Sequence, residues 1–235
     1  MDNPLLKEFF SSKLEIYHNK CVQGSVSESA AERTIEFVRQ LIAIPLKEYV
    51  EYILANPSSA IITSLNITQA SHIELCKSEM CDAFRKCGYK GMTILEIGKA
   101  LHNVQEDWAC LDKKELNRLS KYGENVKGAA QLGLTLFKTD KWFLSYFGVI
   151  YPRLDNGEQN ALIARCLLRD PFYAHLFREA IHREVNLHEE MLGLGESTKI
   201  RRKTSVLAFC RIVETQANIE GLVMFHPISF EIIKA

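Results

Sequence analysis

The segment ESTKIRRKTSVLAFCRIVE, residues 196–214, places four cationic side chains within five positions. Lysine and arginine can neutralise phosphates, and arginine can also pair with a guanine edge through two hydrogen bonds. The helical period predicts a buried face with Val206, Phe209, Cys210 and Val213. The opposite face is basic and small enough to enter a major groove, with Arg201, Thr204, Ser205, Ala208 and Arg211. Closer to the buried side, in the first turns, phosphate contacts suit Lys199, Arg202 and Lys203.

A single basic helix end is often only a solvated surface, so a second one carries weight. Residues 112–134 predict another long helix, capped by Asp112 and closed by Gly133. On its outer face, asparagines that suit adenine edges alternate with lysines that suit phosphates. These residues are Lys114, Asn117, Lys121 and Asn125.

Two apolar, β-rich runs, LTLF and WFLSYFG, follow this second helix. They predict a β-hairpin with Thr139 and Asp140 at its tip. Lys138 and Lys141 flank the tip, and we expect them to contact a phosphate backbone beside the groove that the helix enters.

The formal net charge of the 235 residues is zero, but the charge is unevenly distributed. Residues 113–153 carry 8 basic and 3 acidic side chains, and residues 196–235 carry 6 and 4. The other stretches are acidic, with 11 basic and 15 acidic side chains in 1–112 and 4 and 7 in 154–195. Each positive stretch coincides with a predicted basic helix, which favours nucleic-acid binding.

The elements around the basic helices predict two similar units. Residues 93–103 form a short helix capped by Thr93, and the helix over 112–134 and the hairpin follow. A short helix, a longer helix and a hairpin in this order are typical of a winged helix. The second unit begins after a boundary near 151–157 with two helices joined at Asp170 and Pro171. A short helix over NLHEEMLGLG, the basic helix, and two strands over IEGLVMF and SFEIIKA are expected to follow.

Residues 1–90 predict a helical N-terminal part without a catalytic signature. Helices are expected over NPLLKEFFSSKLEIYHNK, from a Ser29 and Glu32 capping pair to Pro45, and over LKEYVEYILANP. A strand is expected over SAIITSLNIT. The predicted fold class is therefore mainly α with small β wings (α+β). It consists of the N-terminal part, 1–90, and two winged-helix (helix-turn-helix) units, 91–153 and 154–235.

The sequence predicts no cofactor and no metal. A restriction-type nuclease needs an Asp and an Asp/Glu-x-Lys motif, and the one match, Asp112 to Lys114, begins a predicted helix rather than lying on a strand. HEEM at 188–191 lacks the second histidine of the zinc motif H-E-x-x-H, and no phosphate-binding glycine loop is present. Zinc-type donors cluster without paired C-x-x-C spacing at His72, Cys76, Cys81 and Cys87.

The seven cysteines do not form a disulfide framework, which indicates reduced thiols. The sequence shows neither a secretory signal nor an apolar run of about 18 residues, so no membrane partner is expected. These observations predict a cytoplasmic, nucleoid-associated protein.

Four segments together resemble the winged-helix units of type II and type IIS restriction endonucleases and of restriction-associated proteins. They are TILEIGKAL, the helix ending NVKGAAQLGL, the run WFLSYFG and the segment ESTKIRRKTSVLAFCRIVE. The resemblance covers residues 91–216 and implies a tandem winged-helix DNA-recognition domain. By this resemblance the DNA contacts include Lys199, Arg201, Arg202, Lys203 and Thr204. The sequence departs from the family in lacking a recognisable nuclease, and in having Cys210 and Ile212 where an aromatic residue is common.

The expected function is binding of double-stranded DNA, with sequence preference, as the recognition module of a restriction system or a related DNA-binding protein. Its partners include a homodimer mate or a separate nuclease chain as open alternatives. Two other functions stay open: a winged-helix protein–protein interaction module, and a Mg²⁺-dependent restriction nuclease with an unrecognised active site. Enzymatic activity is thus left undecided, with the balance against it.

Overall fold

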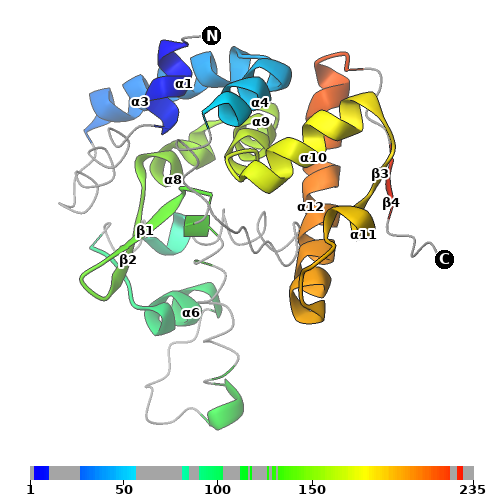
Figure 1. Cartoon of the computed structure of the whole chain (residues 1–235). Coiled ribbons are helices and arrows are strands. Elements are labelled where there is room, and N and C mark those ends of the chain that lie inside the picture. The colour runs from blue at the N-terminus through cyan, green and yellow to red at the C-terminus, as the bar shows by residue number, and fades with distance from the viewer. Residues whose placement is uncertain are drawn as a thin grey trace. The chain divides into compact units, whose positions relative to one another are not determined.

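The structure is a computed structural model that describes residues 3–10, 27–56, 81–84, 90–102, 112–115, 117, 126, 129–130, 132–222 and 227–229. The described part is mainly helical with small sheets, which confirms the predicted mainly α class (Figure 1). Contacts divide the chain into unit 1, comprising Met1–Ser11, Val38–Ala70 and Asn156–Ala235, and unit 2, comprising Ser12–Phe37 and Ser71–Asp155. None of the helices in these described ranges is long and apolar enough to cross a membrane. The strand expected over SAIITSLNIT lies outside the described residues.

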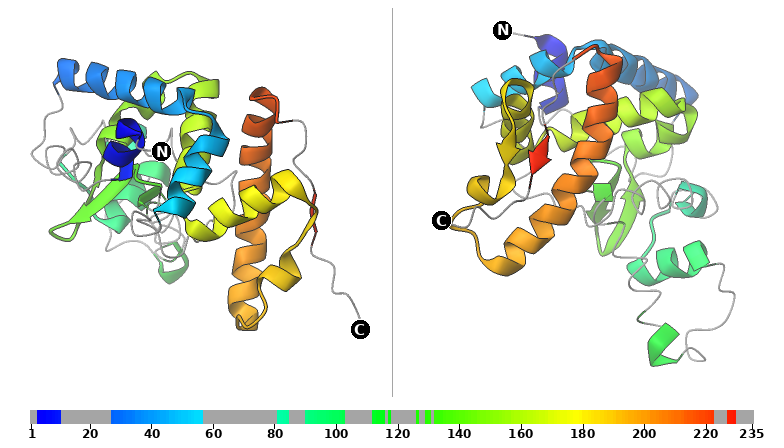
Figure 2. Two further views of the ribbon diagram at one scale, coloured as in Figure 1. Left: turned by 45° about the horizontal axis from the view of Figure 1, so that its top comes forward. Right: turned by 90° about the vertical axis from the view of Figure 1, so that its right-hand side faces the viewer.

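Unit 1 is built from helices that share one apolar core: α1 (Pro4–Phe10), α4 (Leu46–Ala55), α9 (Asn156–Leu167), α10 (Pro171–His182) and α12 (Glu196–Ile219). Helix α4 packs against α10, and α9 packs against α12 (Figure 2). Their fully buried side chains include Phe9, Tyr49, Leu162, Phe177, Phe209 and Val213. Burial of this apolar surface is the main term that stabilises unit 1.

Local capping explains where several helices begin. Asp170 caps α10 by accepting a hydrogen bond from the Phe172 amide at 2.9 Å, and Pro171 occupies the first position, as predicted. The long helix α3 (Glu28–Ala43) begins earlier than predicted, because Ser27 rather than Ser29 accepts from the Ala30 amide. The Ser29 cap was therefore wrong.

The predicted second hairpin is wrong at its start, residues 219–222, and the rest of its two strands except Ser229 lies outside the described residues. Helix α12 continues through Ile219, and Gly221, with φ +69°, ends it with the Leu222 amide bonded to the Ala217 carbonyl. Strand β4 (Ile228–Ser229) pairs with β3 (Val185–Asn186), and the pairing is parallel rather than that of a hairpin. The short helix α11 (Leu187–Glu190) follows β3.

Unit 2 contains the predicted short helix as α6 (Ile94–His102). The Thr93 amide donates to the Glu96 carboxylate at 2.7 Å, and the Glu96 amide donates to the Thr93 hydroxyl at 3.3 Å, so the predicted cap is a capping box. Strands β1 (Thr135–Lys138) and β2 (Lys141–Leu144) form the predicted antiparallel hairpin. Met92, two residues before α6, forms an antiparallel bridge with Trp142 through N···O distances of 2.8 and 2.7 Å.

The run WFLSYFG does not stay extended to its end. Strand β2 stops at Leu144, because Ser145 accepts a hydrogen bond from the Gly148 amide and caps the helix α8 (Tyr146–Ile150). The 3-10 turn Tyr151–Arg153 follows α8. Gly148 lies so close to the Leu134 carbonyl that a Cβ atom there would be 2.1 Å from the oxygen, which explains a glycine inside this buried helix.

Candidate nucleic-acid interface

The hairpin of unit 2 presents two lysines opposite each other. Lys138 and Lys141 are register partners and both are exposed. The two residues between them, Thr139 and Asp140, have φ of +49° and +61°, which is the geometry of a type I′ turn. Because Thr139 is β-branched, this left-handed conformation is strained. The turn therefore places two cations at the tip of a short hairpin.

An aromatic pair lies next to these lysines. Phe137 and Trp142 are also register partners, and their ring centroids are 5.0 Å apart. Trp142 is buried, whereas the Phe137 side chain is 56% exposed. Phe137 was not among the residues predicted from the sequence, and strand alternation does not mark it, because Thr135 on the same face of β1 is buried.

Both ends of the predicted helix over 112–134 have the expected caps. The Asp112 carboxylate accepts from the Glu115 amide at 2.8 Å, which gives this carboxylate a capping role. Gly133, with φ +76°, is followed by Leu134, whose amide bonds to the Ala129 carbonyl at 2.9 Å. Of the predicted contacts, Lys114 and Asn117 are exposed, and Lys121 and Asn125 lie outside the described residues.

The cationic run at the start of α12 is partly engaged by neighbouring groups. Lys199 donates to the Glu196 carboxylate at 2.8 Å, and this hydrogen bond lowers the pKa of Glu196. The guanidinium carbon of Arg202 lies 4.3 Å from the centroid of the Phe172 ring. Both side chains are half-buried, as expected for residues near the core side, but Lys203 is exposed, so its placement near the core was wrong.

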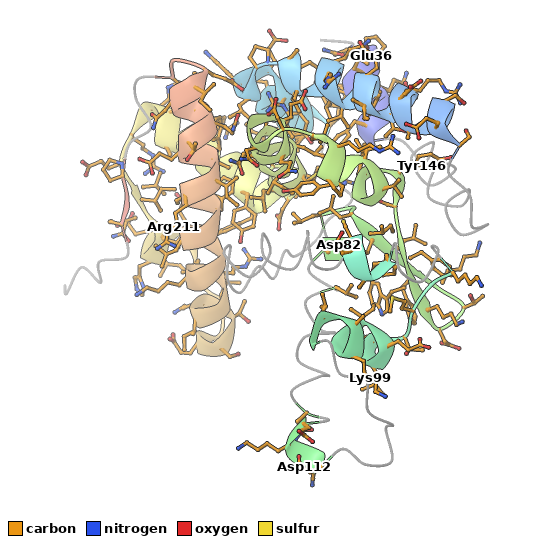
Figure 3. The ribbon with its side chains drawn as sticks, turned by 180° about the vertical axis from the view of Figure 1, so that it is seen from behind. Glu36, Asp82, Lys99, Asp112, Tyr146 and Arg211 are labelled. Atoms are coloured by element: carbon orange, nitrogen blue, oxygen red, sulfur yellow. The ribbon has the colours of Figure 1, made fainter. Side chains whose placement is uncertain are left out.

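The outer face of α12 carries Arg211, which is exposed and forms no ion pair with the described residues (Figure 3). The same face also exposes Ile200 and Leu207, one heptad apart, with relative exposures of 66% and 47%. The side chains of Arg201, Thr204 and Ser205 lie outside the described residues, although their backbone belongs to α12. The predicted buried face is confirmed for Val206, Phe209 and Val213.

The far end of α12 is held by a buried arginine. Arg165 on α9 is almost fully buried, and its guanidinium donates to the carbonyls of Ile42 and Ile44 at 2.7 and 2.6 Å. It also donates to Glu220 at 3.1 Å, and the other Glu220 oxygen accepts from the Leu46 amide at 2.8 Å. Burial lowers the pKa of Arg165, and Glu220 opposes this shift. In the sequence, the one signal for this role is that Arg165 is a charged residue inside the apolar run ALIARCLL.

The described residues contain no cluster of histidine, cysteine or carboxylate side chains that could hold a metal ion. Of the four zinc-type donors, Cys81 is buried with its thiol 3.4 Å from the Gly148 carbonyl oxygen, and His72, Cys76 and Cys87 lie outside the described residues. Comparison of the chain with protein-family models, curated proteins and solved structures finds no match.

Proposed function

We propose that the chain binds double-stranded DNA with sequence preference, through a winged helix in unit 2 and a helix-turn-helix in unit 1. The observation that carries this proposal is the bridge between Met92 and Trp142. It joins a residue before α6 to β2, which then lies between that residue and β1, and the order is strand residue, short helix, the longer helix predicted over 112–134, and two-stranded wing. This order supports a winged helix, and the exposed lysines Lys138 and Lys141 at the wing tip suit phosphate contacts.

Unit 1 supports the proposal by a similar order of elements. Strand β3, helix α11 and helix α12 follow one another, and Asn186 caps α11 as Thr93 caps α6. Gly193, with φ +85°, lies in the turn between α11 and α12, where helix-turn-helix motifs often have glycine. Helix α12 then corresponds to the recognition helix, and Arg201 and Arg211 are its proposed base-reading residues.

The salt dependence of binding tests this proposal. Fluorescence anisotropy with a labelled duplex is expected to show log affinity falling linearly with log salt. Lys138→Ala/Lys141→Ala should weaken binding to all sequences and reduce the slope by about 2, since each phosphate contact contributes about 0.9. Lys7→Ala/Lys47→Ala is the matched control, because it also removes two exposed lysines but from α1 and α4. A wild-type chain without salt-dependent duplex binding would exclude the proposal.

Sequence preference is a separate part of the proposal. Arg201→Ala and Arg211→Ala should broaden the set of duplexes selected from a random pool, because bidentate guanine contacts contribute about 1–3 kcal/mol of discrimination. Unchanged selection by both variants would leave only sequence-independent binding. The resemblance of residues 91–216 to restriction endonuclease recognition domains makes a restriction system the setting that we propose.

A second candidate function is protein–protein interaction through α12. The exposed Ile200 and Leu207 favour it, since apolar side chains in the centre of an exposed helix face are typical of interfaces. Leu207→Glu should abolish a protein complex detected by light scattering or pull-down while leaving duplex affinity of unit 2 unchanged. Loss of duplex binding in the Lys138→Ala/Lys141→Ala variant would favour DNA as the ligand instead.

A further inference from the structure

Among the described residues, the large hydrophobic side chains that are exposed are leucines and isoleucines, with one aromatic residue, Phe137. Its ring contacts Trp142 on one side, with an interplanar angle of 45°, and leaves more than half of its surface open. The neighbouring Trp142 is fixed by the bridge to Met92. The exposed ring therefore packs on one side against a buried tryptophan.

The position of Phe137 on the hairpin follows from strand alternation. Thr135 and Phe137 point to the same face of β1, because they are two residues apart. The Thr135 hydroxyl donates to the Val126 carbonyl at 2.9 Å, so this face meets the segment 112–134. Phe137 thus lies on the side of the hairpin that faces the proposed recognition helix of unit 2.

On each strand a lysine is the sequence neighbour of the aromatic residue, and alternation directs the lysine to the opposite face of the hairpin tip. Lys138 follows Phe137 in β1, and Lys141 precedes Trp142 in β2. The two lysines are register partners on either side of the turn, at the end of the paired strands β1 and β2 that Figure 1 shows. An exposed ring on a hairpin whose tip carries lysines suits unpaired nucleotides, since the ring stacks on a base while the long lysine side chains reach the adjacent phosphates.

An intact duplex cannot use this ring, because its bases are already stacked on one another. We propose that Phe137 stacks on an unpaired or unstacked base, so that unit 2 prefers DNA with a bulged base over the same duplex fully paired. This inference rests on the proposed DNA binding and deepens it: the lysines supply affinity for any DNA, and Phe137 supplies preference for a local defect or a site that the protein opens.

The test compares three labelled DNAs: a paired duplex, the same duplex with one bulged 2-aminopurine, and the single strand with 2-aminopurine. The wild-type chain should bind the bulged duplex about 10-fold or more tighter than the paired one, which corresponds to about 1.4 kcal/mol. Binding should also quench the 2-aminopurine fluorescence, because the base stacks on the ring.

Phe137→Leu keeps an apolar side chain over Trp142 and is the variant that should fold normally, checked by circular dichroism and thermal unfolding. It should lose the preference for the bulge and the quenching, whereas Phe137→Trp should retain both. Lys138→Ala/Lys141→Ala should weaken binding to the paired and bulged duplexes by the same factor.

The outcomes separate the inference from the proposed function. If Phe137→Leu keeps the bulge preference and the quenching, or if the wild-type chain binds both duplexes equally, Phe137 does not stack on a base, although DNA binding stands. If the wild-type chain binds none of the three DNAs, both proposals are overturned.

Discussion

Glu220 is the residue at which the structure makes its sharpest prediction about stability. Its carboxylate contacts the buried Arg165 guanidinium at 3.1 Å and the Leu46 amide at 2.8 Å. The side chains of Arg165 and Glu220 are 1% and 21% exposed. Glu220→Ala removes the acidic partner of a buried cation and the acceptor for the first turn of α4 in one change.

The magnitude follows from burial. Removing one partner of a buried, hydrogen-bonded ion pair costs roughly 3–5 kcal/mol, because the other charge stays buried without compensation. The carbonyls of Ile42 and Ile44 still accept from Arg165, which places Glu220→Ala at the lower end, about 3 kcal/mol. Glu220→Gln keeps one acceptor and should cost less than the alanine variant.

Urea unfolding followed by circular dichroism measures this loss, and hydrogen exchange of the Leu46 amide reports it locally. Glu28→Ala is the matched control: Glu28 pairs with Arg153, with a second contact of 3.0 Å, but the Glu28 side chain is 68% exposed, so we expect little change. A loss below about 1 kcal/mol for Glu220→Ala, or equal losses for both variants, would refute the reasoning from burial.

Three further predictions concern other elements. Burial raises the pKa of the Cys210 thiol from 9.0 to about 12, so its alkylation by iodoacetamide at neutral pH should be about 1,000-fold slower in the folded chain than in urea, as measured by mass spectrometry; equal rates would contradict this. Hydrogen bonds from Thr93 lower the pKa of the Glu96 carboxyl from 4.5. The contribution of this carboxylate to the stability of the fold is therefore complete above pH 4.5 and is lost as the pH falls through the lowered pKa. Glu96→Gln should therefore flatten the acid limb of stability against pH, and an unchanged limb would count against the capping box. Thr139→Asn/Asp140→Gly should increase the free energy of unfolding by roughly 1–2 kcal/mol in urea titrations, because it relieves the left-handed strain of the turn; a decrease would show that no such strain exists.

Local chemistry made much of the helical fold predictable. Caps at Thr93, Asp112 and Asp170 mark helix starts within a few residues, since each uses a side chain that lies next to the amides it satisfies. The hairpin tip at Thr139 and Asp140 was predicted from two apolar runs around a polar tetrapeptide, and the structure confirms it. These signals need only neighbouring residues.

Long-range contacts account for what was missed. The run IEGLVMF was expected to be a strand from Ile219 on, but Ile219 ends α12 and Glu220 contacts Arg165 and Leu46, which lie 55 and 174 residues away. The parallel pairing of β3 with β4 likewise depends on segments that no local pattern relates. At the candidate interface, the helical period identified the exposed side of α12 but did not single out Leu207, which lies at the margin of the predicted outer face at about 100° per residue.

The buried arginine also determines how the chain can be divided. A fragment that begins at residue 154 would retain Arg165 and Glu220 but lose the carbonyls of Ile42 and Ile44, and with them α4, which packs against α10. Such a fragment would expose an apolar surface on α10 and would be a natural target for proteases and chaperones. A fragment designed to contain α12 therefore has to include residues 38–56 as well, joined to the rest of unit 1 by a linker that replaces unit 2.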